Sequence, residues 1–184
     1  MRCVAAAALL SEAARVFNSD FLPNVRPVPA VLARLHLRVG DLAAARSWAA
    51  TAGVAPGDDL DYLHEYEHLT LARLLLADHH ATGNLDRLDQ ATELLERLHD
   101  AATTAQRTAT RVEALLLLAV AADTAGRADE ALSQVETAAE LTRPSGWVRL
   151  GDRALQVPSV LNYQTVLSSS VRLPSVAVGT TQTV

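Results

Sequence analysis

Three glycines recur in this chain at a fixed interval: Gly83 follows Gly40 by 43 residues, and Gly126 follows Gly83 by the same number. On both sides of each glycine, apolar residues recur at the spacing of an amphipathic helix. A glycine between two helices ends the first one easily, because it has no side chain to oppose a left-handed backbone. Repetition at this interval is typical of a helical solenoid. The sequence therefore predicts an all-α fold, a right-handed α-solenoid of about three helical hairpins.

The hydrophobic periodicity and the turn residues together predict where each helix lies. A proline-rich connector over residues 21–29 separates the first helix from the second, since each proline disfavours α geometry in the residue before it. Asp41 is suited to cap the helix after Gly40, and Asp59 or Asp61 to cap the helix after the next loop. The predicted helices cover residues 4–17, 28–39, 42–51, about 60–79, 85–105, 108–125 and 128–141.

Small residues at matching positions after two of the glycines support the repeat. They fit a tetratricopeptide-like pattern, in which small side chains let the two helices of a hairpin approach closely. In the middle hairpin Leu88 stands where the others have alanine, and Ala91 would match only if the turn had gained three residues. The matching positions are Ala45, Ala49 and Ala52 in the first hairpin, and Ala131, Val135 and Ala138 in the third.

Composition supports a helical scaffold without nucleic-acid binding of its own. Alanine and leucine, the strongest apolar helix formers, dominate the chain, while aromatic residues make up only 4%. The net charge is −5 at pH 7, and the basic residues are scattered among acids. A nucleic-acid interface usually shows a basic stripe that neutralises phosphates. We therefore expect no direct contact between this segment and nucleic acid.

Cysteine content and hydropathy indicate a cytoplasmic protein. Cys3 is the only cysteine, so the chain has no internal disulfide and no thiolate zinc cage. The apolar run after Arg2 is short and is interrupted by Glu12 and Arg15, unlike a secretory signal. No apolar run reaches the ~20 residues that span a bilayer. We expect no membrane association.

The helical character is confined to residues 1–150. Residues 151–184 are rich in serine, threonine and valine, contain Pro158 and Pro174, and lack both helical period and strand alternation. We expect one helical-repeat domain over 1–150 and an irregular or disordered tail over 151–184, and the hypothesis is that the tail is unrelated sequence.

His64, Glu65 and His68 form an H-E-x-x-H motif, the only literal catalytic motif in the chain. On a helix the two histidines share one face and can hold zinc, with the glutamate as general base. A zinc hydrolase also needs a third ligand, and residues 69–74 (LTLARL) lack the usual downstream histidine spacing. We expect no metal, no cofactor and no catalytic site.

The alternative for this helix is amphipathic packing. Its leucines would then face neighbouring helices, while Glu65, His68 and Arg73 line a groove or solvent and Arg73 pairs with Glu65 or Glu67. The leucines concerned are Leu60, Leu63, Leu71, Leu74 and Leu75.

The few aromatic residues have two interpretations. They fill gaps between helices, or some of them lie on the concave face of the superhelix. In the second case Tyr62, Tyr66 and Arg73 would contact an inducer or a protein partner. The gap fillers would be Trp48, Trp147, Tyr62, Tyr66 and Phe17.

Three runs resemble the helical-repeat region of large LuxR-family transcriptional activators of the MalT type. The runs are LLSEA at 9–13 with FLPNVRPVPA at 21–30, YLHEYEHLTLAR at 62–73, and ELTRPSGWVRL at 140–150. The resemblance covers roughly residues 5–150 and keeps the family's order of segments. Its specificity lies in the combination of runs, because none of them is catalytic.

The resemblance implies a role in regulation. Such regulators carry an ATPase module, a middle superhelix and a DNA-binding helix-turn-helix, and the superhelix receives an inducer or regulatory protein that controls self-association. This sequence has no G-x-x-x-x-G-K-[ST] loop and no recognisable helix-turn-helix, so it looks like the middle segment.

The sequence departs from the family after Leu150. Gly151-Asp152-Arg153 stands where relatives usually continue with Phe-Val-Asp-Glu-Gly. A truncated or frame-shifted gene would explain this. Reading the genomic DNA beyond codon 150 in all frames tests it, and no family-like continuation in any frame would count against it.

The best interpretation is a sensor or interaction segment of a regulator, which self-associates in response to its inducer. The alternative is a stand-alone tetratricopeptide-type adaptor, and a zincin-like hydrolase through His64, Glu65 and His68 ranks third. Neighbouring reading frames distinguish the first two. Near-stoichiometric zinc that is lost on His64→Ala would favour the third.

Overall fold

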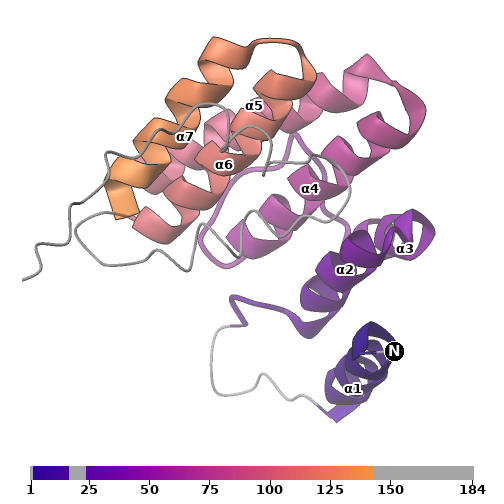
Figure 1. Cartoon of the computed structure of the whole chain (residues 1–184). Helices are drawn as coiled ribbons and strands as arrows, with labels where there is room; N and C mark the ends of the chain where they lie inside the picture. Colours follow the sequence, from indigo (N-terminus) through magenta and orange to yellow (C-terminus); the bar gives the residue numbers. More distant parts are fainter. Residues whose placement is uncertain (1, 17–23, 143–184) are drawn as a thin grey trace, which may run out of the picture.

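A computed structural model describes residues 2–16 and 24–142, and this part of the chain contains seven helices and no strand (Figure 1). The all-α prediction is thus confirmed for these residues, whereas Phe17, Trp147 and the predicted tail lie outside them. None of the described helices is long and apolar enough to cross a membrane. The helices are α1 (Arg2–Val16), α2 (Val28–Val39), α3 (Leu42–Ala52), α4 (Glu65–Thr82), α5 (Leu85–Thr104), α6 (Thr108–Thr124) and α7 (Ala128–Thr142).

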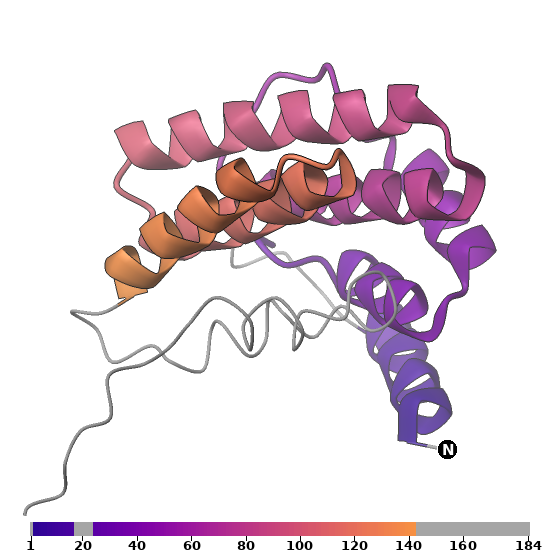
Figure 2. The ribbon, with the colours of Figure 1, turned by 45° about the horizontal axis from the view of Figure 1, so that its top comes forward.

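The helices form a stack of hairpins. Helices α2 and α3, α4 and α5, and α6 and α7 pack as pairs, and the first helix of each pair also contacts the first helix of the next. Figures 1 and 2 both show the chain advancing from α1 at one end to α7 at the other. The second helices begin at Leu42, Leu85 and Ala128, so they keep the 43-residue interval.

The three periodic glycines have the left-handed backbone that the sequence predicts. Their φ angles are 80° at Gly40, 71° at Gly83 and 75° at Gly126. At Gly40 and Gly126 the helix ends in a Schellman motif of two backbone hydrogen bonds. The Gly126 N–H donates to the Asp123 carbonyl at 2.9 Å, and the Arg127 N–H donates to the Ala122 carbonyl at 2.8 Å. Asp41 caps α3 as predicted, because its Oδ1 accepts from the Ala44 N–H at 3.0 Å.

The start of α4 is a correction to the sequence prediction. The helix begins at Glu65 with His64 as its N-cap, several residues after the predicted caps Asp59 and Asp61. Asp61 Oδ1 instead accepts from the Leu63 N–H at 2.7 Å and the His64 N–H at 3.0 Å. Aspartate readily closes such a local turn, and here the turn takes the residues that the prediction gave to the first helical turn.

The core is centred on α4, α5 and α6. The side chains of Leu94, Leu95 and Leu98 on α5 are almost fully buried. Helix α6 is buried on two sides, as its continuous apolar run predicts: Leu117 and Leu118 join the cluster with α4 and α5, while Leu115 and Leu116 join the one with α7. This double burial fixes α6 between the α4–α5 hairpin and its own partner α7.

The middle hairpin keeps the same register as the others. Helix α5 begins at the periodic position, so its turn has gained no residues and Ala91 does not take the alanine place. Leu88 occupies that place and is buried, as are Ala45 and Ala131 at the equivalent positions. The repeat therefore tolerates a larger side chain between α4 and α5.

Gln106, like Gly53 before α4, is a left-handed turn residue that the periodic glycines do not reveal. Its φ is 54°, the one positive value at a residue other than glycine in the described chain. The Arg107 N–H donates to the Ala102 carbonyl at 2.8 Å, and the Gln106 N–H donates to the Thr103 carbonyl at 3.1 Å. These bonds match those at Gly126. A side chain in this conformation costs about 1 kcal/mol.

We expect Gln106→Gly to raise the free energy of unfolding by about 0.5–1 kcal/mol, because glycine adopts this conformation without strain. Urea unfolding followed by circular dichroism measures the change. The reverse substitution Gly126→Gln is the matched control and should lower the stability by a similar amount. A Gln106→Gly variant less stable than wild type would contradict the assignment of this turn.

Candidate functional site

A groove of about 390 Å³ lies where the segment before α2 meets the N-terminal ends of α4 and α6. Three separate parts of the chain supply its walls, so the groove exists only once the hairpins have stacked. Its lining residues are Val25, Arg26, Tyr62, Glu65, Tyr66, Leu69, Arg107, Thr108, Ala109, Thr110 and Glu113.

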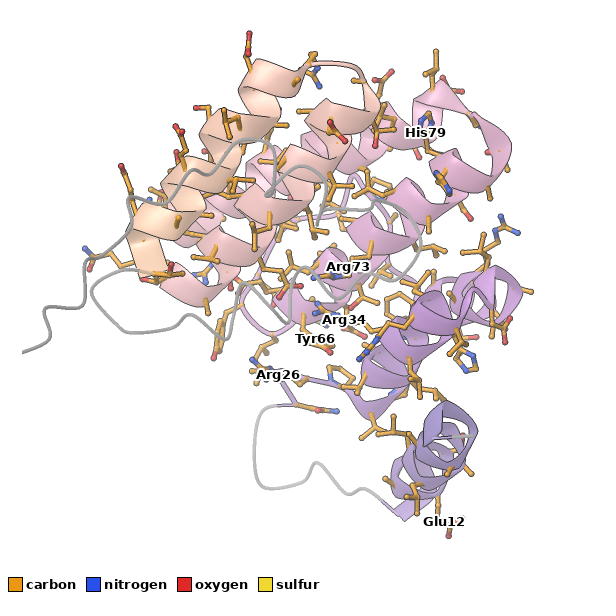
Figure 3. The ribbon with its side chains drawn as sticks, viewed as in Figure 1. Glu12, Arg26, Arg34, Tyr66, Arg73 and His79 are labelled. Carbon is orange, nitrogen blue, oxygen red and sulfur yellow. The ribbon has the colours of Figure 1, made fainter. Side chains whose placement is uncertain are left out.

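Tyr66 is the aromatic residue around which the groove is arranged. The guanidinium carbon of Arg34 lies 3.7 Å from the centre of the Tyr66 ring, and that of Arg26 lies 5.7 Å from it. Figure 3 shows Tyr66 between these two arginines. Stacking of a guanidinium group on an aromatic face holds both groups in place.

Arg34 also connects the first helices of the three hairpins, α2, α4 and α6, through the N–H groups of its guanidinium. From α2, its Nε donates to Thr70 Oγ1 of α4 at 2.7 Å, and its Nη2 donates to the Tyr66 carbonyl at 3.2 Å. Its Nη1 lies 2.8 Å from Glu113 Oε1 of α6. Burial lowers the pKa of Arg34, with the charge of Glu113 opposing the effect, yet an arginine stays protonated at neutral pH.

Glu113 is shared by two arginines. Arg73 of α4 donates to the same Oε1 atom from Nε at 3.3 Å and from Nη2 at 3.2 Å. Burial by itself raises the pKa of the Glu113 carboxyl, but Arg73 and Arg34 outweigh it and hold this pKa below its usual value. The predicted pairing of Arg73 with Glu65 or Glu67 is thus wrong, because α6 presents a carboxylate to the face of α4 that carries Arg73.

Glu65 makes a second polar contact between α4 and α6. Its Oε2 lies 2.6 Å from Nε of Arg107, and its Oε1 accepts from the Thr110 hydroxyl. Although Glu65 lines the groove as expected, it is buried by these partners. The guanidinium group of Arg107 also lies 5.8 Å from the ring centre of Tyr62.

The histidines of the H-E-x-x-H motif have different surroundings. The His64 side chain is 53% exposed and its Nδ1 lies 2.7 Å from Asp61 Oδ2. His68, expected on a groove or in solvent, is instead buried, with Nδ1 3.0 Å from the His64 carbonyl and Nε2 3.6 Å from Asp58 Oδ2. Across the described ranges, no three His, Cys, Asp or Glu residues are arranged to hold a metal ion.

The leucine prediction for this helix is only partly right. Leu71, Leu74 and Leu75 are buried in the main core, and Leu60 packs against its edge. Leu63 is 46% exposed. It lies in the turn before α4, so the helical spacing that predicts its burial does not apply.

The predicted contact residues divide into two groups. Tyr62 and Tyr66 line the groove, whereas Arg73 lies behind Glu113 and is not among the lining residues. Sequence reasoning missed Arg26, Arg34 and Glu113. A signal was present for one of these contacts, since Arg73 and Glu113 are 40 residues apart, close to the 43-residue repeat.

Stacked helical hairpins with a groove across their first helices define a helical-repeat scaffold. A family model described as the MalT-like TPR region matches residues 2–150, so the chain belongs to this family. The resemblance found in the sequence is confirmed. Comparison with curated proteins finds no match, and comparison with solved structures likewise finds none.

We expect Glu113→Gln to lower the free energy of unfolding at pH 7 by about 2–3 kcal/mol, because it leaves two partly buried guanidinium groups without their shared counter-charge. Urea unfolding measures the loss. Glu96→Gln, an exposed change of the same kind on α5, should stay within about 0.5 kcal/mol of wild type.

The lowered pKa of Glu113 also predicts how the stability difference between wild type and Glu113→Gln changes with pH. Because the folded state lowers the Glu113 pKa, the carboxylate stabilises the fold above the ordinary value of 4.5 and loses this effect as the pH falls through its folded pKa. The stability difference between wild type and Glu113→Gln should therefore narrow below about pH 4.5. A difference that stays constant down to pH 3 would contradict the assigned ion pair.

His64 offers a test of the turn before α4. The hydrogen bond that the His64 Nδ1–H donates to the Asp61 carboxylate raises the His64 pKa above its ordinary value of 6.5. Its small stabilising effect is present below pH 6.5 and is lost as the pH rises through the raised pKa. We expect Asp61→Asn to lower the His64 pKa in an NMR titration, while Asp89→Asn on α5 leaves it unchanged. An unchanged His64 pKa in Asp61→Asn would contradict this contact.

Proposed function

We propose that the chain is the helical-repeat sensor segment of a MalT-type, LuxR-family transcriptional regulator. Its helices form a right-handed α-solenoid, and its groove receives an inducer or a regulatory protein in the cytoplasm. The segment then relays binding to the ATPase and DNA-binding modules that such regulators carry, through self-association. The proposal assigns no chemical reaction to the chain.

One observation carries the proposal: Tyr66 lines the groove and also holds Arg34, which joins α2, α4 and α6. A molecule that enters the groove therefore touches the contact that orients one hairpin against the next. The family match to the MalT-like TPR region over residues 2–150 supports the same role.

The geometry of that contact supports the proposed relay. The α2–α3 hairpin has a small apolar cluster of Ala30, Ala33 and Trp48, whereas the larger core lies among α4, α5 and α6. A ligand on Tyr66 would change the stacking partner of Arg34. Because Arg34 also binds Glu113, a shift at the groove changes the angle of α2 and α3 relative to α4 and α6.

A thermal-shift screen of the purified chain against small metabolites and candidate protein partners tests the binding role. For each ligand found, we expect Tyr66→Ala and Tyr62→Ala to weaken binding by about tenfold or more, since each removes an aromatic contact. Arg73→Ala should weaken it less, because Arg73 acts through Glu113. Circular dichroism verifies that each variant is folded at the assay temperature.

Leu85→Ala is the matched control, because Leu85 is 66% exposed on α5 and does not line the groove. It should bind like wild type. If a ligand binds Tyr62→Ala, Tyr66→Ala and wild type with the same affinity, its binding site lies outside this groove. Flanking DNA that encodes a phosphate loop upstream and a helix-turn-helix downstream would support the regulator assignment, and its absence would favour an adaptor.

A further inference from the structure

The groove and the residues that pair with its walls carry a surplus of positive charge. Glu65 and Glu113 are the acidic lining residues, and each is already neutralised, Glu65 by Arg107 and Glu113 by Arg34 and Arg73 together. With Arg26, four guanidinium groups meet two carboxylates. The whole chain, in contrast, has a net charge of −5. Positive charge is thus concentrated at this groove.

Among the four arginines at the groove, Arg26 is the one that the described residues leave without a counter-charge. It is exposed and lines the groove. Its guanidinium carbon lies 5.7 Å from the centre of the Tyr66 ring, and it forms no ion pair in the described part of the chain. The ring carries no full charge, so the guanidinium donors of Arg26 stay open to an acceptor in the groove. An anion would satisfy both their charge and their hydrogen bonds.

The opposite wall offers donors as well. Arg107 uses Nε for Glu65, and its two terminal nitrogens bind no acceptor within the described residues. Beside it, α6 begins with Thr108, Ala109 and Thr110, which line the groove; the helix has no acidic residue in its first turn and no capping side chain. The partial positive charge of a helix start adds to that of the arginines.

We infer that this groove binds a small organic molecule bearing a carboxylate or phosphate group. Arg26 and Arg107 supply the opposing charges, and the rings of Tyr62 and Tyr66 flank the rest of the molecule. The inference rests on the proposed function and names the chemical class of its inducer. A volume of about 390 Å³ suits a small molecule better than a folded partner.

Citrate and its neutral trimethyl ester are the probes for this inference, because they share a skeleton and differ in charge. In ¹H–¹⁵N NMR titrations of the wild-type chain, citrate should shift the amide signals of Ala109 and Thr110, and the ester should not. The dissociation constant for citrate should rise with added sodium chloride, as screening predicts. Equal shifts from citrate and the ester would overturn the inference.

Arg26→Gln and Arg107→Gln identify the charges responsible. Each should weaken citrate binding by about three- to tenfold, because each removes one charge-assisted contact. Arg87→Gln removes the same charge from an exposed arginine of α5 that contacts only Gln90 among the described residues, and it should bind citrate like wild type. Equal weakening in Arg26→Gln and Arg87→Gln would reduce the effect to net charge and overturn the assignment.

The outcomes separate this inference from the proposed function. Suppose that an uncharged ligand loses affinity in Tyr66→Ala but binds Arg26→Gln as well as wild type. This result would support the proposed sensor role and overturn the inference that the ligand is an anion. Citrate binding that depends on Arg26 would support the class even where no inducer is yet identified. If citrate causes no amide shifts at any concentration up to about 50 mM, the inference would also be overturned.

Discussion

Two arginines that share one carboxylate hold the first helices of the hairpins together. Arg34, Glu113 and Arg73 come from α2, α6 and α4, and the three side chains are between 13% and 18% exposed. Leaving any one of these charges without its partner at such burial is costly, so the helices keep the arrangement that pairs them all. Leucine contacts between helices are less directional and would tolerate small rotations.

The contacts of Arg34 matter most for the orientation of the α2–α3 hairpin. Its own apolar cluster is built mainly from alanines with Trp48, so it contributes less burial than the leucine core of α4, α5 and α6. The stacking of Arg34 on Tyr66 therefore carries much of the orientation of this hairpin. Because Tyr66 is also a wall of the groove, the proposed ligand contact and the hairpin orientation share one side chain.

Local chemistry explains which predictions the structure confirms. The left-handed turns at Gly40, Gly83 and Gly126, the Asp41 cap and the double burial of α6 all follow from the residue types within a few positions. The errors arise where a side chain has two local options. Asp61 closes a turn before α4 instead of capping it, and Leu63 is consequently exposed.

The sequence by itself determined the helices, their periodic turns and the family, because backbone propensity and hydrophobic spacing act over a few residues. Only the tertiary structure decided the polar partners. Glu113 pairs with Arg73, 40 residues away, and Glu65 with Arg107, 42 residues away, although nearer opposite charges exist. Stacking brings residues about one repeat apart onto facing helices, and which of them meet depends on the rotation of each helix in the packed core. The groove therefore has no sequence motif, because its walls meet only after the hairpins have packed.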